Sequence, residues 1–174
     1  MAKFSDYQLI LDELKMTLSH VEADEFSTFA SKILHAEHIF VAGKGRSGFV
    51  ANSFAMRLNQ LGKQAHVVGE STTPAIKSND VFVIISGSGS TEHLRLLADK
   101  AKSVGADIVL ITTNKDSAIG NLAGTNIVLP AGTKYDEQGS AQASQLFLDS
   151  VVMGLMTEMN VTEQTMQQNH ANLE

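Results

Sequence analysis

The sequence predicts an α/β fold in which a five-stranded parallel sheet lies between layers of helices. The first observation is a set of five short runs rich in Val and Ile, each bounded by turn residues, near residues 38–42, 65–68, 81–85, 107–112 and 126–129. The second is that helical patterns alternate with these runs. Strands connected in this way pair in parallel and are buried on both faces, so they read as continuous apolar runs. A three-layer sandwich is therefore expected.

Two segments between the expected strands carry apolar residues at helical spacing. Residues 47–61 and 91–104 are expected to be helices because their apolar side chains recur every three or four residues. These side chains are Phe49, Val50, Phe54, Leu58 and Leu61 in the first segment, and Leu94, Leu97, Ala98 and Ala101 in the second.

The ends of the chain are expected to be helical extensions of a single domain that spans residues 1–174. Ser5 and Gln8 have the spacing of a capping box ahead of a first helix, and a second helix is expected after Glu22. Residues 145–159 are apolar on most of their circumference, which predicts a helix that is either deeply buried or in contact with another subunit.

Composition limits the classes of function. A chain of 174 residues with 43% apolar residues can bury one core. Its net charge of −6 argues against non-specific binding to nucleic acid, and the lack of cysteine excludes thiolate nucleophiles and cysteine-bound metals. The N-terminal stretch has no apolar core of the kind that marks an export signal, and no run is long enough to span a membrane, so a cytoplasmic protein is expected.

Two glycine-rich turns are the strongest functional signal. The first, Gly43 to Gly48, follows one apolar run, and the second, Ser86 to Thr91, follows another. Each leads into an expected helix, whose free N–H groups and positive dipole end attract anions. Ligands of open parallel sheets bind beyond the carboxyl ends of the strands. A phosphate-binding cleft is therefore expected there, with Lys44 and Arg46 supplying local positive charge.

Two other interpretations of these turns stay open from the residues alone. Gly43, Gly45 and Gly48 match the G-x-G-x-x-G fingerprint of dinucleotide-binding folds, and Glu70 stands where a ribose-binding acid is expected. The glycines also suit ordinary tight turns, although that explanation does not account for the serines and threonine that accompany them.

The residues resemble the SIS (sugar isomerase) domain family, and within it the 6-phospho-3-hexuloisomerases. The resemblance rests on four segments, which are VAGKGRSGFVANSFAMRLNQLG at 41–62, VVGESTTP at 67–74, ISGSGSTEHL at 85–94 and NHANLE at 169–174. It spans nearly the whole chain. It implies an SIS fold, interconversion of a 3-keto hexulose 6-phosphate with fructose 6-phosphate in the ribulose monophosphate route of formaldehyde fixation, no cofactor or metal, and a homotetramer.

The resemblance also implies roles for particular residues. The sugar phosphate is expected to bind to Ser47, Ser86, Gly87, Ser88, Gly89, Ser90 and Thr91. His170 belongs to the terminal family motif and is expected at the active site, where it reaches a neighbouring subunit. From the residues alone, a solvated position near a chain end explains His170 as well as a role at the active site does.

One departure from the family concerns the general base. Hexuloisomerases carry a segment with a catalytic glutamate just before the long C-terminal helix, whereas this chain runs from Gln142 directly into Ala143. Either the segment is deleted, or further chain stands between these two residues. We expect that further chain stands between them, because a protein that keeps every phosphate-binding residue is not expected to lose its general base. Cα atoms more than about 3.8 Å apart would mark such a break.

Without that segment, no other carboxylate receives a catalytic assignment from the sequence. Glu70 and the pair Asp136 and Glu137 suit exposed loops, and Glu92 suits the first turn of a helix, where it complements the helix dipole. Two alternative functions therefore stay open. They are a non-catalytic sugar-phosphate-binding SIS module and an aldose–ketose phosphate isomerase.

Overall fold

A computed structural model describes residues 4–130 and 136–173 of the chain, with side chains from residue 140 onward in the second range. The elements in chain order are η1 (Phe4–Asp6), α1 (Tyr7–Leu18), α2 (Ala23–His35), β1 (Ile39–Gly43), α3 (Arg46–Gln60), β2 (Ala65–Val67), β3 (Val81–Ile85), α4 (Glu92–Ser103), β4 (Asp107–Thr112), β5 (Thr125–Val128), α5 (Asp136–Glu158) and α6 (Glu163–Gln168). All five expected strands and both expected inter-strand helices are present, displaced by at most a residue or two at their ends.

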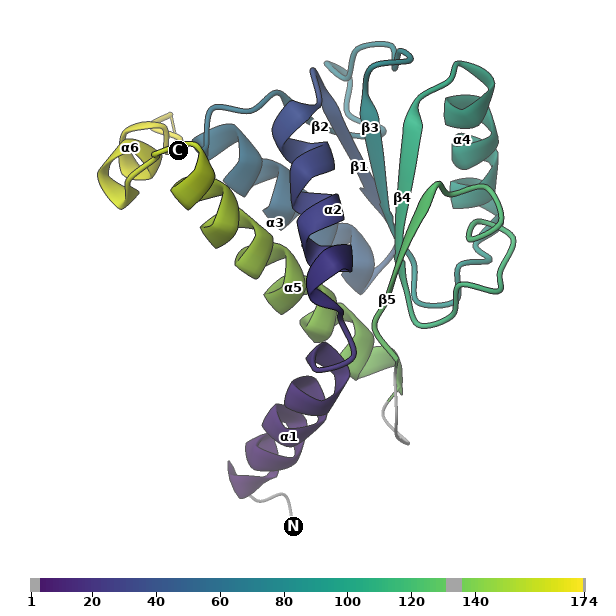
Figure 1. Ribbon diagram of the computed structural model, residues 1–174, viewed down its shortest axis with the longest axis vertical. Helices are drawn as coiled ribbons and strands as arrows, with labels where there is room; N and C mark the ends of the chain where they lie inside the picture. Colours follow the sequence, from purple (N-terminus) through teal and green to yellow (C-terminus); the bar gives the residue numbers. More distant parts are fainter. Residues whose placement is uncertain (1–3, 131–135, 174) are drawn as a thin grey trace.

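The five strands form one parallel sheet in the order β2-β1-β3-β4-β5 (Figure 1). Alternate residues of each strand point to opposite faces, so Ile39 and Val41 join one apolar cluster while Phe40 and Ala42 join another. Both clusters are buried, which explains why the strands read as continuous apolar runs. The expected three-layer α/β architecture is confirmed.

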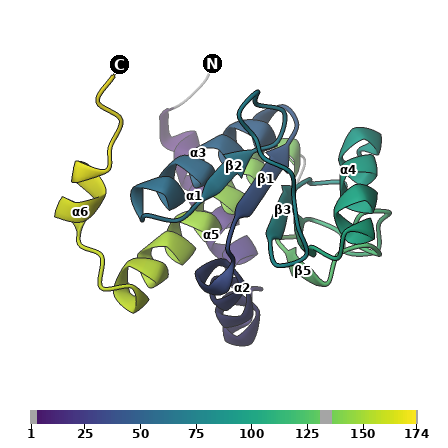
Figure 2. The same cartoon turned by 90° about the horizontal axis from the view of Figure 1, so that it is seen from above.

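The two faces of the sheet are covered unequally. Helices α2, α3 and α5 pack on one face, where their side chains share a cluster with Val41, Val83 and Val109. On the opposite face α4 is the one helix among the described residues, and two connections, 68–80 and 113–124, cross it without helical structure (Figure 2). This second face therefore has a thinner cover.

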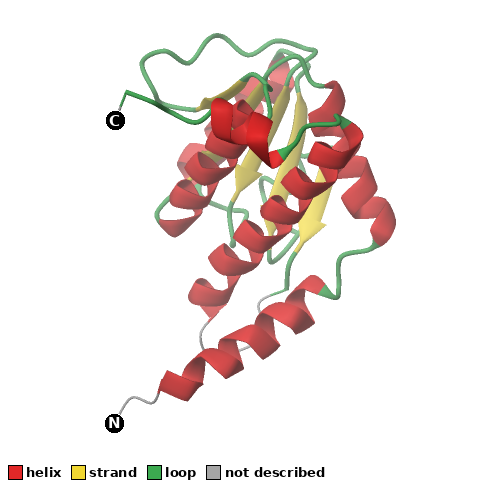
Figure 3. Cartoon of the chain, turned by 90° about the vertical axis from the view of Figure 1, so that its left-hand side faces the viewer, coloured by secondary structure: helices red, strands yellow, loops and turns green. Residues whose placement is uncertain are grey.

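The helices at the chain ends begin partly where the sequence predicts. Glu22 and Glu25 form a reciprocal capping box at the start of α2, and this boundary is confirmed. The expected capping box of Ser5 and Gln8 is wrong. Ser5 lies in the short η1 turn, and Asp6, which precedes α1, makes no side-chain cap. The turn of η1 already directs the chain into α1, which extends away from the body of the molecule (Figure 3).

Helix α5 is buried for most of its length in its own subunit. The side chains of Phe147, Val151 and Val152 are at most 3% exposed and lie in the cluster with α2 and α3. Leu146 and Met153 remain exposed on the outer side of the same helix. The strongly apolar composition of this segment is therefore explained mainly by burial against the sheet.

A histidine pair joins the amino ends of β1 and β2. Nδ1 of His38 and Nε2 of His66 are 2.9 Å apart, and the two rings stack. The backbone N–H of His38 donates to the buried carboxylate of Asp80 at 3.2 Å. Burial lowers the pKa of His66, and the nearby His38 lowers it further, although Asp80 opposes both effects.

This pair predicts that the folded protein loses stability in mild acid. Because the pKa of His66 is lower in the folded state, the unfolded state takes up the proton first as the pH falls through about 6.5. The free energy of unfolding, measured by urea denaturation between pH 7.5 and 5.0, is expected to fall less in His66→Gln than in the parent. His20→Gln, at an exposed helix end, serves as the matched control. Equal pH dependence in the parent and His66→Gln would contradict this account.

Candidate functional site

The sheet places the two glycine-rich turns side by side. Strands β1 and β3 are neighbours in parallel, and Gly43 at the end of β1 is the register partner of Ile85 at the end of β3. The turns that follow these residues therefore leave the same edge of the sheet from adjacent positions. This arrangement confirms that both turns lie at the carboxyl edge, where ligands of open parallel sheets bind.

The first turn depends on two glycines with different requirements. A Cβ atom on Gly43 would lie 2.5 Å from the backbone oxygen of Ser47, so only glycine lets the first turn of α3 pack against the end of β1. Gly45 precedes α3 and has φ +57°, a conformation that favours glycine. Ser47 is consequently fixed in the first turn of α3, half-buried, beside the exposed Lys44 and Arg46.

The second turn is folded by its own serines. Ser86 is buried at 4% exposure, and its Oγ accepts a hydrogen bond from the N–H of Gly89 at 3.2 Å. Ser88 Oγ accepts from the N–H of Ser90, and the Ser90 hydroxyl donates to the Ser88 carbonyl. The buried Ser86 therefore stabilises the loop from its inner side. Ser88 and Ser90 are exposed and available to a ligand.

The loop after β4 supports this turn, and sequence reasoning missed it. The carbonyl of Gly87 accepts from the hydroxyls of Thr112 and Thr113, at 3.0 and 2.8 Å, and from the Thr113 N–H at 3.0 Å. The carbonyl of Gly89 accepts from Ile119 at 2.9 Å. A signal was present, because two threonines directly follow an apolar run and so stand at the same sheet edge.

Gly89 is the tightest point of the cradle, by which we mean the turns 43–48 and 86–91 together. Its φ is +63°, and a Cβ atom there would collide with the hydroxyl of Ser117. Glycine is therefore required both by backbone conformation and by the close approach of the supporting loop.

Both helices that leave the cradle begin at it with their N-terminal ends. The first N–H groups of an α-helix have no partner within the helix. Neither Gly45 at the start of α3 nor Thr91 at the start of α4 supplies a side-chain cap. These donors, together with the positive ends of the two helix dipoles, suit an anion such as a phosphate.

The carboxylates near the cradle differ in their surroundings. Glu92 is exposed and pairs with Arg95 through contacts of 2.8 and 3.0 Å. The hydrogen bond from Arg95 lowers the pKa of Glu92 and holds it ionised. Glu70 is exposed in the turn after β2, the edge strand. Pairing with Arg95 and the position at the helix start explain Glu92 without a catalytic role.

The expected break between Gln142 and Ala143 is wrong. Helix α5 runs without interruption from Asp136 to Glu158, so these two residues are consecutive in one helix. Asp136 and Glu137 therefore belong to the first turn of α5 and not to a loop. Helix formation extends further toward the N-terminus than the apolar pattern predicts, because the residues before Ala141 are polar or small and give no periodic signal.

The start of α5 lies at the cradle. A Cβ atom built on Gly87 would be 3.3 Å from the hydroxyl of Ser140, one turn of helix beyond Glu137. The described part of α5 therefore approaches the second turn at Ser140.

His170 lies away from the cradle of its own subunit. The amide of Asn169 donates to the carbonyl of Gln60 at 2.9 Å, which attaches the C-terminal segment to the last turn of α3. The cradle, in contrast, lies at the first turn of α3. His170 is exposed, and its Nδ1 is 3.1 Å from the carbonyl of Ala171. One subunit alone does not bring His170 together with the serine turn.

The described residues contain neither a metal-binding cluster nor a membrane-spanning helix. Among the side chains described in residues 4–130 and 140–173, no group of three or more potential ligands from His, Cys, Asp and Glu lies close enough together to hold a metal ion. In the same ranges, no helix combines the length and apolar character needed to cross a bilayer.

The fold and the cradle define a sugar isomerase domain, and the family comparison agrees. The SIS domain model matches residues 32–156, and the chain belongs to this family. The dinucleotide-binding alternative for the first turn is accordingly not supported.

Individual relatives are more specific than the domain. The chain is 39% identical to a 3-hexulose-6-phosphate isomerase of Bacillus subtilis, with 95% of each chain covered. It is 36% identical to a protein of the same name from Mycobacterium gastri, covering 98% of this chain and 90% of that one. A crystal structure of a hypothetical protein from Methanococcus jannaschii, described as inferring a function of 3-hexulose-6-phosphate isomerase, has TM-score 0.90 and 29% identity, covering 98% and 100%.

The alignment lengths indicate that this chain lacks some positions that these relatives have within the aligned region. Ninety-five per cent of 174 residues is about 165, so the 176-position alignment with the Bacillus protein includes about 11 positions that this chain lacks. The same comparison with the Mycobacterium protein gives about 9, from 180 positions and about 171 residues. These relatives therefore have about ten positions within the aligned range that this chain lacks.

The geometry of Gly89 yields a testable prediction. Gly89→Ala is expected to weaken binding of fructose 6-phosphate at least tenfold, because the new Cβ displaces the serine turn from its supporting loop. Gly62→Ala is the matched control, since Gly62 also has positive φ but nothing within 4 Å of a Cβ. Backbone strain is expected to cost each variant about 1 kcal/mol of stability, and the collision with Ser117 adds to this loss in Gly89→Ala.

Titration calorimetry measures the binding, and urea denaturation measures the stability. Parent-like binding by Gly89→Ala, or an equal loss in Gly62→Ala, would show that the contact with Ser117 does not shape the ligand site.

Proposed function

We propose that this chain is a 3-hexulose-6-phosphate isomerase that interconverts D-arabino-hex-3-ulose 6-phosphate and fructose 6-phosphate. Two observations together carry the proposal. The chain is similar over nearly its full length to proteins of that name, and its two glycine-rich turns form a cradle with exposed hydroxyl donors. The relatives are matched over 90% or more of their own length, so the similarity is not confined to a shared domain.

The phosphate of the sugar binds to the cradle. Ser88 and Ser90 offer exposed hydroxyls, and Ser47 and Thr91 stand at the starts of α3 and α4, whose first N–H groups open on the same edge. Ser86, Gly87 and Gly89 hold the shape of the turn through the bonds described above. With a net charge of −6 the protein has no basic field to hold an anion, so these local donors do so.

The reaction moves a carbonyl between carbons 3 and 2. A base removes the proton on carbon 2 of the hexulose, and the electron pair of that bond forms the enediolate. The hydroxyl proton passes from oxygen 2 to oxygen 3, and the base returns its proton to carbon 3. One carboxylate can carry out both proton transfers, and hydrogen-bond donors stabilise the enediolate oxygens.

We assign the base to Glu137. It precedes Ser140, which approaches Gly87, by three residues in α5, and the sequence contains no inserted segment to supply another glutamate. Glu92 is the weaker candidate because the hydrogen bond from Arg95 lowers its pKa and so makes it a weaker base.

The oligomer and the compartment form part of the proposal. We place the protein in the cytoplasm as a homotetramer in which His170 acts at the cradle of a neighbouring copy. Support comes from the exposed position of His170 at the opposite end of α3 from the cradle, and from apolar side chains of α1, Leu9, Leu11 and Met16, that remain more than half exposed in one subunit.

The proposed reaction predicts a specific isotope exchange. Fructose 6-phosphate incubated with the protein in deuterium oxide is expected to lose its carbon 3 proton signal in proton NMR, because the enediolate takes a deuteron from the solvent-exchanged base. Exchange at carbon 1 would instead identify an aldose–ketose isomerase. No exchange, with phosphate binding retained, would identify a non-catalytic sugar-phosphate-binding module.

Two carboxylate variants test the assignment of the base. Glu137→Gln is expected to slow exchange at carbon 3 by at least about 100-fold while fructose 6-phosphate still binds, since a general base contributes on this scale. Glu92→Gln is expected to keep the exchange rate within a few-fold of the parent. Parent-like exchange in Glu137→Gln would refute this assignment and leave the reaction itself intact.

Subunit mixing tests the position of His170. His170→Ala and the double variant Ser88→Ala/Ser90→Ala are each expected to have low activity. Co-expressed, they form mixed oligomers in which some sites combine an intact cradle with an intact histidine, so part of the activity returns. A mixture no more active than the two variants separately would place the whole site in one subunit.

A further inference from the structure

A second cavity lies on the thinly covered face of the sheet. Connection 68–80 carries the chain from β2 to β3 without a helix, so loop side chains rather than a helical row cover the sheet beside α4. Loops do not supply the regular side-chain ridges that fill the space between helix and sheet. A gap of about 120 Å³ remains between α4, the connection and the strands.

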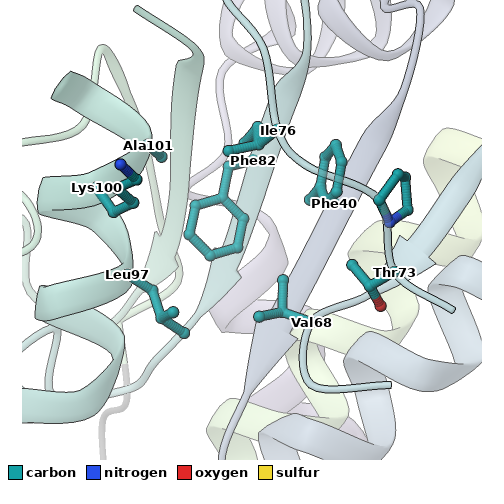
Figure 4. Close-up of a pocket in the computed structure, with 9 residues that line it drawn as sticks. Phe40, Val68, Thr73, Ile76, Phe82, Leu97, Lys100 and Ala101 are labelled. Atoms are coloured by element: carbon teal, nitrogen blue, oxygen red, sulfur yellow. The ribbon is translucent and has the colours of Figure 1, made fainter. Parts of the chain in front are cut away.

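The walls of this cavity are apolar and partly aromatic. Phe40 from β1 and Phe82 from β3 lie on the sheet side, Leu97 comes from α4, and Val68 and Ile76 come from the connection (Figure 4). The two phenylalanines are only 2% exposed and are register partners in adjacent strands. An apolar cavity of about 150 Å³ accommodates benzene, so a volume of about 120 Å³ admits at most one small ring.

A cation stands at the rim. Lys100 of α4 lines the cavity and is exposed. Among the residues that the structure describes, no carboxylate forms an ion pair with Lys100. The protein has a net charge of −6, yet the ammonium group of Lys100 has no carboxylate partner beside this apolar cavity. This cation complements a negative charge on a ligand.

We propose that this cavity binds a small molecule that consists of one aromatic ring bearing one carboxylate. The ring lies among the apolar side chains that line the cavity, and the carboxylate meets Lys100 at the rim. The site is separate from the cradle, because Phe40 and Phe82 stand near the amino ends of strands whose carboxyl ends carry the two turns. The proposal does not depend on the isomerase activity.

Benzoate serves as the probe, and benzyl alcohol is its neutral counterpart of similar size. In carbon-13 methyl NMR, benzoate is expected to give saturable shifts at Val68, Ile76 and Leu97, with weaker binding of benzyl alcohol. Lys100→Met is expected to weaken benzoate binding about threefold and leave benzyl alcohol unchanged, the scale of an exposed ion pair. Lys102→Met, an exposed lysine of the same helix outside the cavity lining, is the matched control.

A second variant tests the cavity itself. Val68 is half-buried in the connection, so Val68→Phe places a larger side chain at the opening of the cavity. This variant is expected to abolish the saturable shifts for both probes. Its remaining methyl spectrum is expected to stay that of a folded protein. The proposal is overturned if benzoate gives only linear, non-saturating shifts. It is also overturned if Lys100→Met and Lys102→Met have equal effects, or if benzoate and benzyl alcohol bind the parent equally.

Discussion

The parallel pairing of β1 with β3 is the constraint on which the rest of the site depends. Gly43 and Ile85 are opposite each other at the ends of these strands, so two turns far apart in the sequence begin from adjacent points. The pairing of β3 with β4 then brings Thr112 and Thr113 beneath the second turn, where they bind the Gly87 carbonyl. A shift in either register would separate the serines from the first turn or from their support.

The cradle that results combines backbone and hydroxyl donors with two local cations, Lys44 and Arg46. Two glycines, Gly43 and Gly89, permit the close approach of backbone segments, and the starts of α3 and α4 add the ends of two helix dipoles. Helix α4 contributes to both the cradle and the apolar cavity. Its first turn borders the cradle, whereas Leu97 and Lys100 further along it line the apolar cavity.

Much of the fold could be predicted from the sequence, because apolar periodicity and turn residues are local signals. The strand positions, the helix after the first turn and the Glu22 cap are of this kind. The start of α5 could not be predicted, since its first residues carry no apolar pattern and the structure alone shows that they are helical. The Ser5 cap failed because a short η1 turn precedes α1.

The site was predicted less completely than the fold. Sequence patterns located both turns, yet they did not distinguish Ser86, which is buried and bonds within the loop, from Ser88 and Ser90, which are exposed. The supporting contacts from Thr112 and Ser117 depend on tertiary packing between loops about 25 residues apart, and no local pattern encodes them. The apolar cavity could not be predicted either. It arises because connection 68–80 covers the sheet beside α4 without a helix, and no sequence motif marks it.

A crystal structure of the protein with fructose 6-phosphate tests the proposed site most directly. We expect the phosphate group within hydrogen-bond distance of the Ser88 and Ser90 hydroxyls and of the first N–H groups of α4, with carbons 2 and 3 directed toward the start of α5. A phosphate bound away from the turn of residues 86–91, or a sugar whose carbons 2 and 3 point away from α5, would contradict it.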